Sequence, residues 1–137
     1  MLIDALRGHE PFRQRVTQEI TARSLATTVI SAFELLSGAR TAREKEKVEQ
    51  ILRPLLILPL DESASRLAAA MRLDLEVRGR GIGMADYLIA AICVSRSFPL
   101  LTRNRDHFER ICRSDSGLSL PRGALTRRSS RRILGQK

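Results

Sequence analysis

The fold of this chain is decided by the stretch GIGMADYLIAA, residues 81–91, together with LLTRNRDHF, residues 100–108. In the first segment Asp86 opens a helix that is apolar on most sides, which is typical of a buried helix. In the second segment a short apolar strand leads into a polar cluster. If the two segments lie side by side in a parallel sheet, they bring carboxylates to one end of it. That arrangement is typical of a Mg²⁺ site for cutting nucleic acid.

Strand and helix patterns alternate over most of the chain. Short, apolar, β-rich runs predict strands at 25–30, 55–60 and 99–102, and Pro59 places the second of them near a sheet edge. The alternation favours an α/β sandwich around a parallel sheet, in which the end of each strand and the start of the next helix share one edge. Helical periodicity predicts helices at 1–7, 11–22, 31–39, 41–52, 61–77 (capped by Asp61 or Ser63), 84–96 and 106–111.

The composition bounds the class of protein. A chain of 137 residues makes one domain, and 43% hydrophobic residues is ordinary for a globular protein. The sequence has no apolar run near the roughly 20 residues that a membrane helix needs, and its start, MLIDALR, lacks the pattern of a signal peptide. The two cysteines, Cys93 and Cys112, have no metal-binding spacing, which predicts reduced thiols in a cytoplasmic protein.

The positive charge is concentrated towards the C-terminus. The net charge is +9, and residues 113–137 contain seven of the 24 basic residues but only one of the 15 acids. Their Ser, Arg, Gly and Pro content predicts a basic, flexible tail that follows a domain at residues 1–112. Two roles for this tail stay open: it holds RNA through phosphate contacts, or it is a solvated and dispensable end.

Four polar side chains fall where a strand ends or a helix begins. Glu34 follows the first predicted strand, and Asp86 opens the buried helix. Asn104 and Asp106 follow the last predicted strand. In the predicted sheet all four lie at one edge, where carboxylates repel one another unless a cation lies between them. Mg²⁺, which is hard and prefers oxygen ligands, is the natural occupant.

Three of these side chains also have a purely structural interpretation. Ser31-x-x-Glu34 matches a capping box, in which Glu34 caps the start of its own helix. Asp86 gains from the helix macrodipole without any metal, and Asn104 is suited to an N-cap. Taken singly, these interpretations compete with metal binding. The joint occurrence of the four side chains is what favours a metal site.

Four segments together resemble a known family in their order and spacing: LIDALRG at 2–8, TVISAFELLSG at 28–38, IGMADYLIAA at 82–91 and TRNRDHFERI at 102–111. The family is that of the PIN-domain endoribonucleases, and in particular the VapC toxins of bacterial type II toxin–antitoxin pairs. The resemblance covers residues 1–112.

The resemblance implies a PIN-like α/β/α sandwich and a Mg²⁺-dependent endoribonuclease, with Mn²⁺ as the alternative ion, that hydrolyses phosphodiester bonds in RNA. A cognate antitoxin would hold it inactive, and the protein would be a cytoplasmic homodimer. By the same resemblance Glu34, Asp86 and Asp106 would be the catalytic carboxylates. The metal ligands would be these three and Asn104, with Asp4 as a supporting acid.

The sequence departs from the family at its start. Family members normally begin with an apolar strand that ends in Asp-Thr-Asn or Asp-Thr-Ser, lies at the centre of the sheet and supplies a principal ligand. This sequence begins at Met1, after both, so we expect a PIN-like sheet that lacks the N-terminal strand and exposes two strand edges. Only Leu118–Leu120 is available as a closing strand before the basic tail. An alternative function follows: a truncated, catalytically impaired PIN protein that binds antitoxin or RNA without cleavage.

Overall fold

The computed structural model describes residues 25–98, 100–101, 111 and 132–134. Within these ranges the chain alternates strands and helices, as the sequence predicts. The elements are β1 (Leu25–Thr28), α3 (Val29–Gly38), α4 (Ala42–Leu52), β2 (Leu56–Leu58), α5 (Glu62–Val77), α6 (Met84–Ser95), β3 (Leu100–Leu101) and β4 (Arg132–Leu134).

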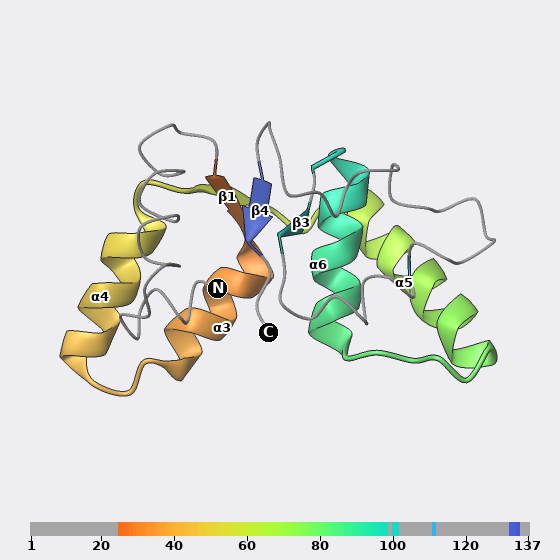
Figure 1. The fold of residues 1–137 in the computed structure, drawn as a ribbon, viewed down its shortest axis with the longest axis horizontal. Coiled ribbons are helices and arrows are strands. Elements are labelled where there is room, and N and C mark those ends of the chain that lie inside the picture. The colour runs from red at the N-terminus through yellow and green to blue at the C-terminus, as the bar shows by residue number, and fades with distance from the viewer. Residues whose placement is uncertain (1–24, 99, 102–110, 112–131, 135–137) are drawn as a thin grey trace.

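The four strands form one parallel sheet in the order β2-β1-β4-β3. Ala26 of β1 pairs with Leu56 of β2 on one side and with Ile133 of β4 on the other. In Figure 1 the sheet lies above α3, with α4 to the left and α5 and α6 to the right. The predicted α/β class with a parallel sheet is confirmed, and β2 lies at an edge of the sheet, as Pro59 predicts.

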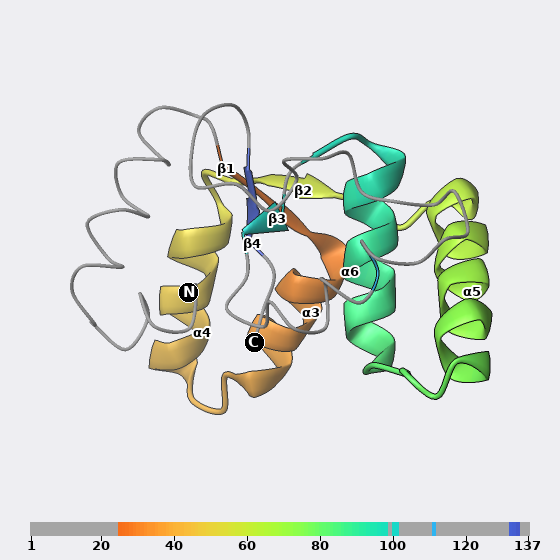
Figure 2. The same cartoon turned by 45° about the vertical axis from the view of Figure 1, so that its right-hand side comes forward.

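The core of the described chain is centred on α6, which packs against α5 (Figure 2). In α6 almost every side chain between Tyr87 and Cys93 is buried, because this helix has α5 on one side and the sheet and α3 nearby. Helix α5 is amphipathic and buries one stripe of small and apolar residues at helical spacing. A fully buried isoleucine contributes about 1.5–3 kcal/mol relative to an exposed one, so α6 anchors the fold. The stripe of α5 consists of Ala64, Ala68, Met71 and Leu75.

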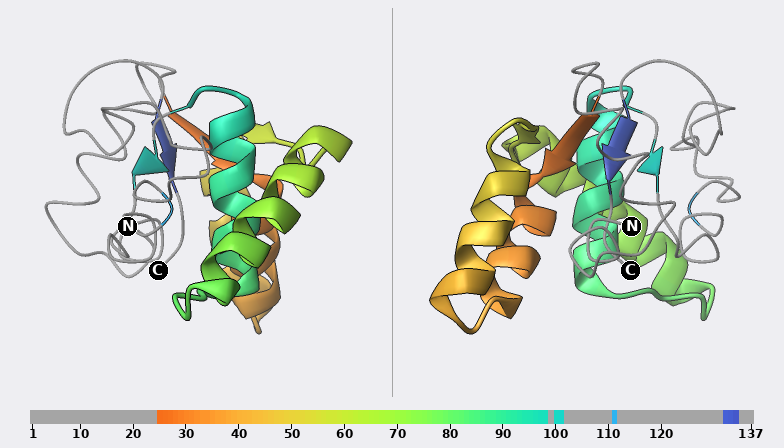
Figure 3. Two further views of the ribbon diagram at one scale, coloured as in Figure 1. Left: turned by 90° about the vertical axis from the view of Figure 1, so that its right-hand side faces the viewer. Right: turned by 60° about the vertical axis from the view of Figure 1, so that its left-hand side comes forward.

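Residues 132–134, from the basic tail, form β4 between β1 and β3 (Figure 3). The prediction of a flexible extension is therefore wrong for these three residues. That prediction rested on the local composition, which is rich in Arg and Ser. The strand forms by pairing with β1 and β3, which are distant in the sequence, and local composition contains no signal of such pairing. We expected two exposed strand edges next to a missing strand, without assigning them to particular strands; the facing edges of β1 and β3 both pair with β4. Residues 113–131, with Leu118–Leu120, lie outside the described residues, and the domain boundary at 112 stays a prediction.

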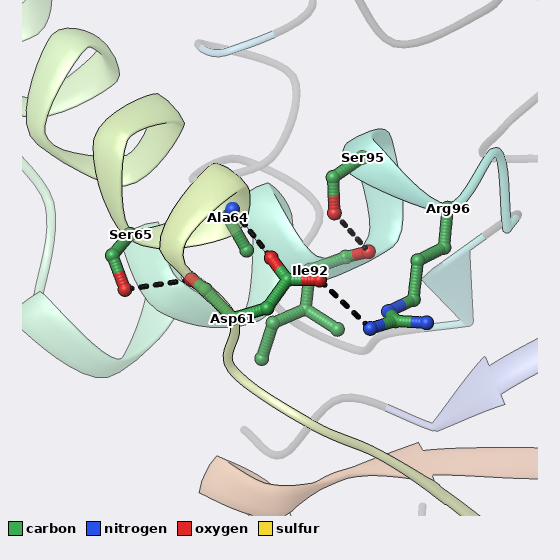
Figure 4. Close-up of polar contacts among 6 residues, drawn as sticks. All are labelled: Asp61, Ala64, Ser65, Ile92, Ser95 and Arg96. Atoms are coloured by element: carbon green, nitrogen blue, oxygen red, sulfur yellow. Dashed lines mark hydrogen bonds and ion pairs between the residues drawn. The ribbon is translucent and has the colours of Figure 1, made fainter.

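Helices α5 and α6 are tied together at one end by Asp61 (Figure 4). Asp61 is the N-cap of α5: its Oδ1 accepts the Ala64 N–H at 2.8 Å. Its Oδ2 accepts a hydrogen bond from Nη2 of Arg96, the C-cap residue of α6, at 2.9 Å. One carboxylate thus accepts a backbone N–H at the start of α5 and pairs with an arginine at the end of α6. Of the two predicted caps, Asp61 and Ser63, the structure uses Asp61.

The C-terminal ends of α5 and α6 share one hydrogen-bond pattern. After α5, Gly79 N–H donates to Glu76 O and Arg80 N–H to Leu75 O. After α6, the corresponding donors are the N–H groups of Ser97 and Phe98. This is the Schellman motif, whose turn residue adopts a positive φ. That residue is Gly79 (φ 65°) after α5 but Ser97 (φ 54°) after α6.

Candidate active site

Helix α3 begins with a buried pair of hydroxyl groups. Thr28, the last residue of β1, is the N-cap: its Oγ1 accepts the Ser31 N–H at 3.1 Å. The same Oγ1 lies 3.1 Å from Ser31 Oγ in a second hydrogen bond. Both side chains are fully buried. The start of α3 is therefore fixed to the end of β1 by two short contacts.

The predicted capping box of Ser31 and Glu34 is wrong. The helix begins at Val29, two residues earlier than expected, and its first turn contains no acid. Thr28 already provides the side-chain oxygen that a helix start needs. Glu34 lies in the second turn, beyond the position of a capping-box acid. The structure thus removes the capping interpretation of Glu34, whose side chain is partly buried.

Helix α6 begins in the opposite way. Its N-cap is Gly83, which has no side chain to accept a hydrogen bond. Asp86, the third residue of the helix, is only 2% exposed. A Cβ atom at Gly83 would lie 3.6 Å from Asp86 Oδ2, so the carboxylate turns back towards the helix start. Negative charge is stabilised there by the macrodipole, which makes this a favourable place for a buried acid.

The segment before α6 is held by a tyrosine. The hydroxyl of Tyr87, a buried residue of α6, accepts the backbone N–H of Ile82 at 3.0 Å. The Asp86 and Tyr87 N–H groups both donate to Gly83 O, at 3.1 and 3.2 Å. The turn at residues 82–83 is therefore fixed from both sides, and with it the place of the Asp86 carboxylate.

The two acids come from helices that are in contact, since α3 packs against α6. In Figure 1 the arrows of β1 and β4 point to the lower side of the molecule, where α6 begins and towards which α3 runs. The helices that bear Glu34 and Asp86 thus reach the same end of the sheet, the end that parallel α/β sheets use for binding. Asn104, Asp106 and Asp4 lie outside the described residues, and their place in the site stays a prediction.

The described acids suit a hard divalent cation. Mg²⁺ is commonly bound through one or two carboxylates together with waters and substrate phosphates. Glu34 and Asp86 offer two carboxylates in a largely buried setting. Among the described residues no group of three or more His, Cys, Asp or Glu side chains is placed to hold a metal ion. Two carboxylates, if they share one ion, are enough for Mg²⁺ in this mode, and the roles of Glu34 and Asp86 as ligands stay predictions.

Two features of the site were missed by reasoning from the sequence. Thr28 is the cap of α3, and the signal was a threonine at the end of an apolar run, three residues before Ser31. The second is the strand at 132–134, for which the only local signal was the apolar pair Ile133-Leu134 between basic and small residues.

Cys93 is a free, buried cysteine. Burial raises the pKa of its thiol, which favours an inert role in the core.

The family model of the PIN domain matches residues 1–114 of this chain. The part of the chain that the structure describes contains no helix long and apolar enough to cross a membrane. Ribonuclease VapC10 of Mycobacterium tuberculosis is 34% identical over 108 residues, which cover 79% of this chain and 80% of that protein. Ribonuclease VapC1 of Methanocaldococcus jannaschii is 29% identical over 112 residues, with 81% and 80% covered.

Solved structures share the fold. A DNA-bound VapBC from Salmonella typhimurium matches with a TM-score of 0.66 and 20% identity, covering 98% of this chain and 90% of that one. VapBC2 from Rickettsia felis, bound to a DNA fragment from its promoter, matches with a TM-score of 0.67 and 17% identity, covering 99% and 92%. The fold, the family match and the identity to VapC10 agree: this chain belongs to the PIN-domain family and, within it, to the VapC group.

Proposed function

We propose that this protein is a Mg²⁺-dependent endoribonuclease, with Mn²⁺ as the alternative ion, and the toxin of a type II toxin–antitoxin pair. The proposal rests above all on Asp86, a carboxylate that is 2% exposed at the start of a helix which packs against the helix of Glu34. Burying a carboxylate is costly unless its charge is paired or stabilised, and the start of α6 is a place that stabilises a negative charge. A pair of such acids at the binding end of a parallel sheet is suited to metal-assisted hydrolysis of a phosphodiester.

The residues of the chain have separate tasks in this scheme. Glu34 and Asp86 would hold the metal, together with Asn104 and Asp106, with Asp4 as a supporting acid. Bound there, Mg²⁺ would supply an activated water and stabilise charge on the phosphate. The Thr28–Ser31 pair holds the start of α3 and so orients Glu34. The helix start at Gly83 and the Tyr87 hydroxyl hold Asp86.

The proposed partners follow from the relatives. VapC10 and VapC1 are named ribonucleases, which supports RNA as the substrate. The structural neighbours are VapBC proteins, which supports a cognate antitoxin as the partner. We place the protein in the cytoplasm, where RNA is available and where a free thiol such as Cys93 stays reduced. By analogy with the family we propose a homodimer.

The test is cleavage of structured RNA by the purified chain in Mg²⁺. We expect cleavage that EDTA abolishes and that falls about 10²- to 10³-fold in both Asp86→Asn and Glu34→Gln, as for loss of a group that stabilises the transition state. Matched controls are Asp74→Asn and Glu62→Gln on α5. Both of these acids pair with an arginine one turn along the helix, so their loss leaves cleavage unchanged.

Two results would contradict the proposal. Cleavage that persists in both Asp86→Asn and Glu34→Gln would rule out the proposed site. Cleavage that persists in EDTA would rule out metal dependence. A folded chain that binds RNA or antitoxin but cleaves no RNA would favour the alternative, a PIN protein that binds without cutting.

A further inference from the structure

Strand β4 joins two parts of the sheet that do not pair with each other directly. β1 and β2 form one pair, and β3 stands alone on the other side. In the described chain, β1 reaches β3 only through β4: Ile133 pairs with Ala26 on one side and with Leu100 on the other. Since neighbouring strands lie about 4.8 Å apart, β4 keeps β1 and β3 about 10 Å apart.

The two parts of the sheet carry different acids of the site. β1 continues directly into α3, which bears Glu34. β3 is the next element after α6, which bears Asp86. Whatever sets the spacing of β1 and β3 therefore acts on the separation of the two carboxylates. Ligands of a metal site must be held within about 0.5 Å of the productive geometry.

We propose that β4, Arg132–Leu134, is a positioning strand for the site. It fills the place between β1 and β3 and thereby sets the distance between Glu34 and Asp86. Its effect on catalysis rests on the proposed function, whereas its place in the sheet rests on the strand register alone. Part of the basic tail is then a strand of the sheet that supports the site. The tail is therefore neither a dispensable end nor only an RNA-binding arm.

The first test is Ile133→Pro in the full chain. Proline removes the N–H of a residue that pairs on both sides, so we expect β4 to leave the sheet. Hydrogen exchange should then accelerate at the backbone amides of β1 and β3, while the α5–α6 pair stays protected. Ile133→Val, which keeps the N–H and suits a strand, should restore native exchange.

The second readout is the Mg²⁺ concentration at which RNA cleavage is half-maximal. A positioning role predicts a rise of about 10- to 100-fold in Ile133→Pro, the size seen when groups that orient metal ligands are lost. Ile133→Val should keep the native value. A merely structural role would lower the amount of folded enzyme and leave this concentration unchanged, so that result would overturn the proposal.

A crosslink keeps the proposal testable if Ile133→Pro fails to fold. In a chain with Cys93→Ala and Cys112→Ser, the pair Ala26→Cys and Ile133→Cys should form a disulfide, because these two residues are register partners. The control pair Leu73→Cys and Ile133→Cys should not, since Leu73 lies exposed on α5. Failure of the first pair to crosslink, or native exchange of β1 and β3 in Ile133→Pro, would overturn the place of β4. If the unaltered chain cleaves no RNA, the proposed function fails, while the crosslink and the exchange still decide the place of β4.

Discussion

Helices α3 and α6 carry the two described acids of the proposed site, yet they begin in opposite ways. In α3 a buried threonine caps the helix and the acid stands in the second turn. In α6 a glycine stands at the cap position and the acid itself lies in the first turn. In α3 the cap residue and the proposed metal ligand are thus separate residues, whereas Asp86 occupies the charge-stabilising place in α6. The difference teaches that Glu34 depends on Thr28 for its orientation, while Asp86 depends on the helix start itself.

The largest effect should come from Mg²⁺ binding. At a concentration 100 times the dissociation constant, a ligand that binds only the folded state stabilises it by about 2.7 kcal/mol. We expect this gain in thermal unfolding of the unaltered chain and its loss in Glu34→Gln and in Asp86→Asn. Because the acids would share one ion, the double variant should lose no more than either single variant. A gain that survives in Glu34→Gln would show that the two helices do not serve one site.

The next effect concerns the cap of α3. Thr28→Val should lower the free energy of unfolding by about 2 kcal/mol, because the buried Ser31 N–H and hydroxyl both lose their partner. Thr28→Ser keeps the oxygen and is the matched control. Denaturant unfolding measures both. A loss in Thr28→Ser with none in Thr28→Val would mean that the methyl group, and not the hydroxyl, holds the start of α3.

A smaller effect separates the ends of α5 and α6. At a positive φ, a residue with a Cβ atom is less stable than glycine by about 1 kcal/mol. Gly79→Ala should therefore destabilise the protein by about this amount, since its added Cβ would meet no atom within 4 Å and only backbone strain remains. Ser97→Gly should stabilise it by about 0.5–1 kcal/mol. Thermal unfolding of both variants checks the opposite signs.

The smallest effect is expected at α4, whose start is a complete capping box. The N–H groups of Thr41 and Arg40 donate to Glu44 Oε2, at 3.0 and 2.9 Å, and lower the pKa of Glu44 below its ordinary value. With a lower pKa in the folded state, Glu44 contributes stability above its ordinary pKa and loses it as the pH falls through the folded value. An NMR titration should show this low pKa, with only a small rise in Thr41→Ala, because that variant removes the weaker contribution of the hydroxyl and keeps both backbone N–H groups.

The sequence predicted the elements of the fold well where local signals are strong. The helices at 41–52 and 84–96 and the edge place of the strand before Pro59 follow from periodicity and from the chemistry of proline, both of which are local. The boundary between β1 and α3 was two residues late, because Thr28 and Ser31 both suit a cap and only the structure shows which one accepts the hydrogen bond.

The candidate site was predictable in part for the same reason. Asp86 stands out because one acid opens an otherwise apolar helix, and the structure finds it buried there. Glu34 carried two interpretations that only the start of α3 could separate. β4 was not predictable from the sequence, because its three residues form a strand only by pairing with β1 and β3, far away in the chain. Non-local pairing leaves no periodic signal.

The place of β4 also has a consequence for how the chain folds. Leu25 pairs with Arg132, so the sheet contains contacts between residues very distant in sequence, and such contacts slow folding because a long loop must close first. During synthesis β1 and β3 are made before the strand that lies between them. Until residues 132–134 have been added, two strand edges are open to wrong partners. We therefore expect aggregation to compete with folding in the nascent chain until β4 has been added.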